Sequence, residues 1–565
     1  MPETPENKPP QDLLEWLGIN NAPNWKVARP LGPLLSVLLF LLFALALIAT
    51  FAIIGRVVLG YMDVTLGVGG LIAALLGAPF LIWSTVLKNT TVRYQKEGHM
   101  TDRIAKAVEM LGAEKTVKKD GVEETKPNLE VRIGAILSLE RIAQDSTTHD
   151  KGRDHVRVME ILCAYIRENA PASSAENHEY GDWEPLKDDP TDDERKAHLA
   201  KRDERFGAHV SEGKVRQWAT TLTPPREDIA QALTIIGRRT HAQLLVEAAW
   251  PNPPSATTTW VFDTECPALP DEPSQTAMTK AEVDAYREQV AAWKKVIEGY
   301  TGYRLDLRGA NLQGADMTKG RYQTARSEKT RLEGADLRQA RMEGADLRQA
   351  RMEGAILRQA RMEGAVLTQA RMEGAILGLA RMEGADLMLA RMEGADLGLA
   401  RMEGAILRLA RMEGADLTQA RMEGADLWLA RMEGAVLTLA RMEGAILGLA
   451  RMEGAILGLA RMEGADLWLA RMDASTSLNL ATLTGAKLRE VDYSNVRISA
   501  EQVNASFGDA SVILPEALRP APDHWLTWKP QYRSDDATEI TFLSEYQRWL
   551  DTPAGEEFIP APPPE

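Results

Sequence analysis

A ten-residue unit, RMEGADLRQA with small variations, repeats without interruption from residue 341 to residue 470. Its letters favour a helix. However, at about 100° per residue a ten-residue step leaves successive copies about 80° out of phase, so no apolar stripe would persist. The glycine in each copy would also cost about 1 kcal/mol relative to alanine in a helix. The period therefore excludes one long helix.

Each unit divides into two fives, in which a small and a large apolar residue stand two positions apart, as Ala345 and Leu347 do. Residues two apart in a strand share a face, so this pair points inward and Asp346 between them points outward. Because five is odd, a straight strand would reverse its faces at every unit. The repeat therefore predicts a coil of short strands with a corner every five residues.

This pattern resembles the A-[D/N]-L-x-x motif of pentapeptide repeat proteins and keeps its register from Leu305 to Ala474. The resemblance implies a right-handed quadrilateral β-helix with four pentapeptides per coil. At about 4.8 Å per coil, the rod would be roughly 40 Å long. Tyr322 and Ser327 replace the central leucine of the motif, and the frame slips by one residue near Ser475.

The N-terminal region has two long apolar stretches, residues 34–54 and 64–87, neither of which contains a charged residue. Each is long enough to cross a hydrocarbon core of about 30 Å. A cleaved signal peptide is less favoured, because the first stretch exceeds a signal core and a second one follows. Lysines and arginines at 26–29 and 88–96 favour cytoplasmic termini. We expect a two-span protein of the bacterial inner membrane, with the lipid bilayer as a partner.

Between these stretches and the repeats the apolar spacing becomes helical, and Thr279 with Glu282 forms a capping-box signature before an apolar stripe. Segments 128–146, 158–171 and 506–525 are similar to those that flank the repeats of membrane-anchored bacterial pentapeptide repeat proteins. The expected fold class is mixed: two transmembrane helices, a small α-helical adaptor and the right-handed quadrilateral β-helix. The expected divisions are a polar tail (1–30), the two-span hairpin (31–88), the helical adaptor (89–170), a charged flexible insertion (171–225), a helix with a Pro-rich linker (226–278), an N-terminal capping helix (279–304), the β-helix (305–500) and a C-terminal cap with tail (501–565).

No motif for chemistry stands out. The chain has no phosphate loop, no spaced Cys/His metal set and no G-x-S-x-G elbow, so we expect no enzyme, no metal and no cofactor. His149 and His155, with nearby aspartates, are the nearest approach to a ligand cluster, but a solvated polar loop is favoured. Cys163 and Cys266 imply no disulfide framework and are interpreted as buried or incidental thiols.

The RMEG units should occupy two opposite faces of the coil, with Arg341 and Glu343 both pointing outward. Exposed pairs of this kind contribute only about 0–1 kcal/mol each. The other two faces hold the candidate interaction residues, because exposed apolar patches usually mark contacts. One face carries Met388, Trp428, Leu429, Leu449, Trp468 and Leu469, and the alternative face carries Ile356, Ile376, Val436 and Ile456.

At two coils apart, Trp428 and Trp468 should lie about 10 Å from each other. Two explanations of these faces without a binding function are also open. Repeat duplication would scatter neutral residues over them, or the cap and adaptor would fold over them.

These observations favour a non-enzymatic, membrane-tethered scaffold that presents a cytoplasmic rod to a protein partner or to another copy of itself. A net charge of −15 argues against nucleic acid as a partner. A topoisomerase-interacting DNA mimic is an alternative implied by the family, but residues 331–470 hold 18 arginines against 21 acidic residues and so lack the acidic surface it needs. A two-span oligomeric channel is a second alternative, weakened by the absence of polar lining residues.

Overall fold

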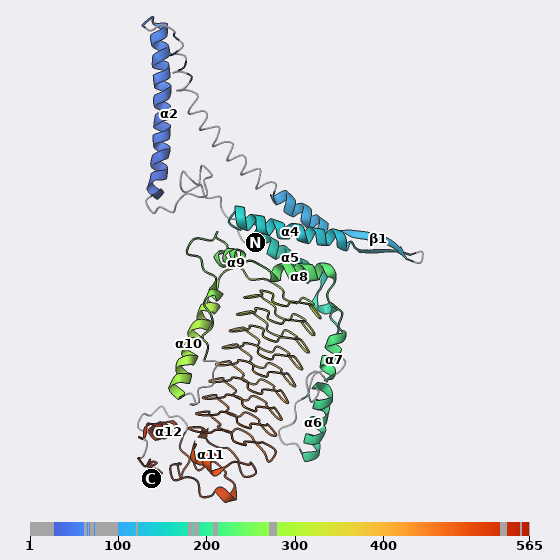
Figure 1. The fold of residues 1–565 in the computed structure, drawn as a ribbon, viewed down its shortest axis with the longest axis vertical. Helices are drawn as coiled ribbons and strands as arrows, with labels where there is room; N and C mark the ends of the chain where they lie inside the picture. Colours follow the sequence, from blue (N-terminus) through green and yellow to red (C-terminus); the bar gives the residue numbers. More distant parts are fainter. Residues whose placement is uncertain are drawn as a thin grey trace. The chain divides into compact units, whose positions relative to one another are not determined.

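The computed structural model describes residues 28–61, 65, 67, 70, 73, 100–119, 122–178, 184, 191–206, 213–269, 279–531, 540–553 and 556–563. It divides into two compact units, residues 1–106 and 107–565, which we describe separately. Figure 1 shows the fold.

The N-terminal unit contains helix α2 (Ala28–Val58). The helix is followed by Gly60, whose φ of 74° suits a residue that ends a helix. Among the described residues, none of the helices combines the length and the apolarity that a membrane span requires. Most of the second expected span, residues 64–87, lies outside the described residues. The two-span hairpin and the channel alternative therefore stay predictions.

The adaptor begins with a helix that ends at residue 111 and continues into an antiparallel hairpin of β1 (Glu114–Lys119) and β2 (Val122–Pro127). The sequence analysis did not predict this hairpin, whose side chains are almost all exposed and therefore give no apolar alternation. The helices that follow pack around a common apolar core. They are α4 (Leu129–His149), α5 (His155–Asn169), α8 (Glu227–Gly237) and α9 (His241–Ala249). The short helix η1 (Ala172–Ser174) follows α5 and has no buried residue.

The repeats form the expected solenoid. Short parallel bridges join each outward residue to the one twenty positions later, from Asp306 with Arg326 to Arg451 with Arg471. The coils stack in a column between the helices of Figure 1. After the frame slip the spacing becomes twenty-one, as in Ile456 with Ser477. The alanines, leucines and methionines of the motif between 335 and 467 are at most 2% exposed.

The adaptor, and not the capping helix expected at 279–304, covers the first coil. The backbone N–H of Asn311 donates to the Ala170 carbonyl at 2.6 Å, and that of Arg321 donates to the Gly237 carbonyl at 2.8 Å. Without such partners the first coil would present unpaired backbone groups at its edge. The boundary between adaptor and solenoid is therefore a hydrogen-bonded junction.

Helix α10 (Lys280–Glu298) has the expected capping box between Thr279 and Glu282, but it runs along the side of the solenoid (Figure 1). Its apolar stripe lies on the glycine corners of one RMEG face. A Cβ built on Gly364 would lie 2.9 Å from Trp293, and one built on Gly384 would lie 2.5 Å from Val290. Only glycine permits this approach, so the capping assignment is corrected to a covering helix.

The opposite RMEG face is covered as well. In place of the flexible insertion that composition predicts at 171–225, the described part forms α6 (Asp192–Phe206) and α7 (Lys214–Thr221) along this face (Figure 1). A Cβ on Gly354 would lie 2.5 Å from Ala219, and one on Gly394 would lie 2.3 Å from Phe206. Although this segment is rich in charged residues, apolar residues such as Phe206 and Ala219 form a narrow stripe that packs on the solenoid.

The described part of the Pro-rich segment, residues 251–269, is likewise packed and not a free linker. It contains η2 (Val261–Asp263), and its Trp260, Phe262 and Cys266 are buried against Trp293 and Ile297. Large apolar side chains among the prolines supply the contact. Both cysteines are free and buried, in agreement with their interpretation as buried thiols.

Residues of the segment 501–565 close the C-terminal end of the solenoid. Strand β3 (Lys487–Leu488) pairs in parallel with β4 (Phe507–Gly508), and Phe507 is buried among the aromatic side chains of α12 (Phe542–Asp551). The Tyr546 hydroxyl donates to the Gly485 carbonyl at 2.7 Å. Two short helices, α11 (Ala500–Asn504) and η3 (Glu516–Leu518), complete this cap.

The charges of the RMEG faces are buried, which corrects the expectation of exposed pairs. The Glu343 side chain is 1% exposed and lies between Arg341 Nε at 3.0 Å and Arg361 Nε at 3.2 Å. The same two contacts recur along each row from Glu333 to Glu453, so each of these glutamates lies between two arginines. The helices on the glycine corners remove these groups from water, a step that the repeat alone did not reveal.

Burial changes the ionisation of these glutamates. It raises the pKa of Glu393 to about 8, and the neighbouring Glu373 and Glu413 add to the effect while Arg411 and Arg391 oppose it. The pKa of Glu403 is raised to about 8 in the same way. A DNA mimic needs exposed negative charge, and these buried rows do not provide it.

We predict that folding stability rises as pH falls from about 8.5 to about 5. Glu393 and Glu403 have pKa values raised from 4.5 to about 8, so the folded state binds their protons more tightly than the unfolded chain does. This contribution is fully present below pH 4.5 and is lost as pH rises through 8. Denaturant unfolding at several pH values should show a flatter slope for Glu393→Gln with Glu403→Gln. The exposed Glu298→Gln is the control and should keep the wild-type slope.

The inward and outward positions of one strand should respond differently to truncation. Leu387 is fully buried, so Leu387→Ala should cost about 2–5 kcal/mol. Asp386 is half-buried and accepts one hydrogen bond, from the Met388 N–H at 3.1 Å, so Asp386→Ala should cost about 1 kcal/mol. Hydrogen exchange of the amides in this coil measures both changes. Equal losses would contradict the assignment of the two faces.

Candidate interaction surface

Two faces of the solenoid are not covered by α6, α7 or α10. We call one the tryptophan face (Met388, Trp428, Leu429, Leu449, Trp468 and Leu469) and the other the isoleucine face (Ile356, Ile376, Val436 and Ile456). All ten residues belong to the outward or corner rows and none is buried. Leu429 is 37% exposed and Ile456 is 45% exposed. The structure therefore places each set on one side, as the sequence predicted.

Leucines occupy the corners of both open faces in an unusual backbone conformation. The last residue of each pentapeptide has a positive φ, which is 59° at Leu429 and 57° at Leu449. This left-handed conformation costs an L-residue about 1–2 kcal/mol. The corner leucines of the isoleucine face, which are Leu379, Leu399, Leu439 and Leu459, are 42–47% exposed.

Glutamine fills the same corner positions in the first coils. There the amide of Gln339 donates to Gln359 at 2.9 Å, and that of Gln349 donates to Gln369 at 2.8 Å. These glutamine amides form hydrogen bonds with one another along the rod, and the row they form is polar. The corner geometry therefore accepts a polar residue, and leucine is not required by the fold.

The two tryptophans form one aromatic pair. Their ring centroids are 5.1 Å apart with an interplanar angle of 37°, which corrects the expected separation of about 10 Å between their side chains. Trp428 leans over Gly448, where a Cβ would lie only 2.3 Å from the ring. Because Gly448 in the intervening coil has no side chain, the two rings can meet.

The sequence analysis missed two further members of this site. The indole N–H of Trp468 donates to Glu490 Oε1 at 3.1 Å, and the Arg489 guanidinium lies 5.4 Å from the centre of the Trp468 ring. Lys529 also pairs with Glu490 at 2.9 Å and helps to keep the pKa of that carboxyl low. The one-residue frame slip places Arg489 twenty-one positions after Trp468, so counting in steps of twenty did not find it.

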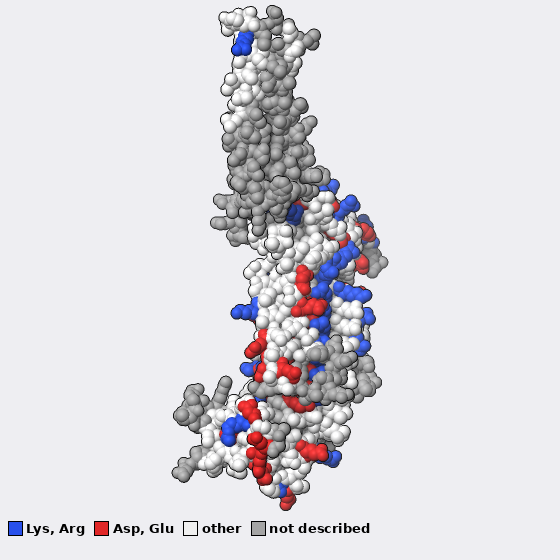
Figure 2. Space-filling model, turned by 60° about the vertical axis from the view of Figure 1, so that its left-hand side comes forward, with Lys and Arg blue, Asp and Glu red and all other residues white. Residues whose placement is uncertain are grey.

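Charge is unevenly distributed on the exposed surface. Figure 2 shows a broad uncharged surface along the solenoid region beside separate groups of acidic and basic side chains. In the outward row of the tryptophan face, Asp426 Oδ1 accepts from the Trp428 N–H at 3.2 Å and Oδ2 pairs with Arg408 at 2.5 Å. Asp426 thus makes a hydrogen bond within its own strand and an ion pair with a neighbouring arginine. The apolar corners are therefore the more prominent feature of this face.

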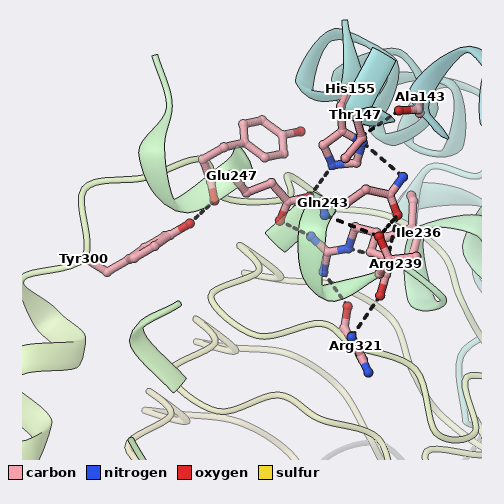
Figure 3. Close-up of polar contacts among 11 residues, drawn as sticks. Ala143, Thr147, His155, Ile236, Arg239, Gln243, Glu247, Tyr300 and Arg321 are labelled. Atoms are coloured by element: carbon pink, nitrogen blue, oxygen red, sulfur yellow. Dashed lines mark hydrogen bonds and ion pairs between the residues drawn. The ribbon is translucent and has the colours of Figure 1, made fainter. Parts of the chain in front are cut away.

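A second polar cluster lies at the junction of adaptor and solenoid (Figure 3). His155 Nε2 lies 2.9 Å from Glu247 Oε1, and both side chains are at most 1% exposed. Arg239 pairs with Glu247 Oε2 and also donates to the Ile236 carbonyl. The interpretation of His155 as part of a solvated loop is therefore wrong. The helical periodicity that begins at His155 was the signal for its burial.

This cluster holds the structure together and offers no reactive group. Burial would raise the pKa of Glu247, but Arg239 and His155 outweigh it and the pKa is lowered. Arg239 also donates to the Arg321 carbonyl in the solenoid. Among the described residues, no group of three or more His, Cys, Asp or Glu side chains is arranged to hold a metal ion.

The comparisons with known proteins identify the repeats. The family model "Pentapeptide repeats" matches in eight copies, at residues 328–364, 348–384, 365–408, 385–424, 395–434 and 415–454. No curated protein sequence matches the chain.

Several solved structures are similar to the solenoid. HetL, a pentapeptide repeat protein involved in heterocyst differentiation regulation from the cyanobacterium Nostoc sp., is 26% identical, with a TM-score of 0.26, over 37% of this chain and 96% of that chain. A pentapeptide repeat protein of the Arabidopsis thaliana thylakoid lumen is 27% identical, with a TM-score of 0.14, over 21% and 72%. QnrB1, a plasmid-mediated fluoroquinolone resistance protein, is 15% identical, with a TM-score of 0.18, over 34% and 85%. With the coil of four pentapeptides, the family match shows that residues 328–454 of this chain are pentapeptide repeats.

Proposed function

We propose that this pentapeptide repeat protein is a membrane-tethered scaffold that binds a protein partner through the tryptophan face. The observation that carries the proposal is the row of exposed corner leucines beside the Trp428–Trp468 pair, on a face that no described helix covers. Surfaces of this kind usually mark contacts in soluble domains. Tryptophan is also enriched among residues that dominate binding energy.

The leucine corners support a role in contact because the fold gains nothing from them. Leu389, Leu409 and Leu429 are 37–41% exposed and have φ values of 58–59°. Gln349 and Gln369 show that the same corner accepts a polar residue. Leucine leaves apolar area in water where glutamine would not, so the sequence of the later coils is better explained by a contact than by folding.

The tethering part of the proposal rests on the uncharged stretches 34–54 and 64–87, the first of which lies within helix α2. A tether would hold the solenoid near a membrane and restrict its partners to those that meet it there. The lysine and arginine bias around the stretches favours a cytoplasmic solenoid.

We predict that polar corners on the tryptophan face abolish the contact without unfolding the chain. The variant carries Leu389→Gln, Leu409→Gln and Leu429→Gln together with Trp428→Thr, because glutamine and threonine occupy these rows in other coils. Cross-linking in native membranes should show the partner band reduced by about tenfold or more, as expected for the loss of dominant contact residues. The melting temperature should stay within a few degrees of wild type.

The matched control changes Leu379, Leu399 and Leu439 to glutamine on the isoleucine face. It removes the same number of exposed leucines and should leave the cross-link intact. If only the control loses the band, the contact lies on the isoleucine face. If both variants fold and keep every cross-link, neither face is the site.

The tether has a separate test. Full-length protein should remain in the membrane pellet after alkaline carbonate extraction, and deletion of residues 31–88 should release it. A reporter fused after Glu565 should be active only in its cytoplasmic form. Extraction of the intact chain by carbonate would exclude the tether, and activity of a periplasmic reporter would overturn the orientation.

A further inference from the structure

A cavity with a volume of about 340 Å³ lies where the adaptor meets the first coil. This volume is within the usual range for small-molecule sites. Helix α5 contributes Glu160, Cys163 and Arg167, and the solenoid contributes Arg326. The loop that enters the repeats supplies most of the remaining wall. The other lining residues are Trp250, Gly302, Tyr303, Arg304 and Asp306.

One of the two acidic groups of this cavity, Asp306, is already neutralised. Asp306 pairs with Arg167 at 3.1 Å and with Arg308 at 2.8 Å. These contacts, chiefly the hydrogen bonds from Arg308, hold the pKa of Asp306 below its usual range although burial opposes them. Asp306 therefore has little capacity to neutralise a further cation.

Two guanidinium groups of the cavity have no carboxylate partner. Among the described residues, neither Arg304 nor Arg326 forms an ion pair. Arg304 donates to the Tyr300 carbonyl at 3.2 Å and lies 5.5 Å from the centre of the Tyr300 ring. Arg304 and Arg326 both line the cavity. The pKa of Arg304 is lowered by burial and then by the positive charge of Arg326.

The acidic residues next to Arg326 do not neutralise its positive charge. Its outward row holds Asp306 on one side and Asp346 on the other, because the bridges join 306, 326 and 346. Asp346 pairs with Arg348 at 2.6 Å, and Glu328 also pairs with Arg348. Both neighbours of Arg326 are thus occupied by other arginines.

The rest of the wall suits a small ligand. Burial raises the pKa of the Cys163 thiol to about 12, so this side chain is neutral. The wall is tightly packed at Gly302, since a Cβ there would lie 2.4 Å from the Glu247 carbonyl oxygen. Trp250 and Tyr303 add aromatic surface. The carboxyl of Glu160 lies at the exposed rim, where burial raises its pKa against the opposing charge of Arg157.

We propose that this cavity binds a small phosphate-bearing anion, with Arg304 and Arg326 as its principal ligands. Two adjacent guanidinium groups match the double charge and the paired oxygens of a phosphate better than they match a single carboxylate. The source of the phosphate is either a free anion or the head group of a phospholipid, and both present the same chemistry to the two arginines. Arg326 belongs to the outward row that continues into the tryptophan face, but none of the six residues of that face lines the cavity.

The test is calorimetric titration of the full-length chain in mild detergent with pyrophosphate and, separately, with a water-soluble short-chain phosphatidic acid. Wild type should bind at least one of them, and Arg326→Gln should weaken that binding by about tenfold or more. Arg326 has no partner among the described residues, so this variant should fold and melt as wild type does. Arg304→Gln should weaken binding in the same direction.

Arg338→Gln is the matched control, because Arg338 is an exposed arginine of the isoleucine face that pairs with Asp336. It should bind as wild type does. Binding of pyrophosphate that is lost in Arg326→Gln assigns a free anion to the site, and binding of only the lipid assigns the head group. No binding by wild type, unchanged binding by Arg326→Gln, or equal loss in Arg338→Gln would overturn the proposal.

Discussion

The structure depends on a left-handed corner at every fifth residue of the repeat. Positive φ values recur at Gly344, Gln349, Gly354 and so on through the solenoid. Each corner turns the chain so that the next alanine and leucine point inward again, which a straight strand of odd period could not do. The backbone N–H and C=O groups then find partners one coil away, so the entire wall is hydrogen-bonded although no strand is long.

The choice of corner residue decides what lies on each face. Glycine at the RMEG corners offers no Cβ, so α10 on one side and α6 with α7 on the other approach the backbone closely. Leucine or glutamine at the other corners keeps helices away and projects a side chain into water. A single repeat of ten residues thus produces two covered faces and two open ones, and the open ones carry the candidate interaction residues.

The solenoid could be predicted from the sequence because its signal is strictly periodic. Even Tyr322 and Ser327, which break the motif, are 3% and 6% exposed and point inward. The covering helices could not be placed, because an apolar stripe such as that of α10 shows that a helix has a partner but not which one. The burial of Glu343 follows from those helices and was missed with them.

Local exceptions to the period were the other source of error. Trp428 and Trp468 are two coils apart, but Gly448 between them lets the rings meet, which the spacing alone does not show. The partners of His155 lie about ninety residues away in α9, so the local helical pattern indicates its burial but not the residues that it contacts. Contacts between segments far apart in the chain decided both cases.

The alternation of charge explains how the covered faces tolerate buried glutamates. Arg411 lies 2.9 Å from Glu393 and 3.7 Å from Glu413, and Arg431 continues the row at 2.7 Å from Glu413. A lone buried carboxylate would carry a large desolvation cost, which a second arginine partly offsets. Removal of one arginine would leave two glutamates with a single partner each. The alternating charges of the row therefore stabilise one another as a group.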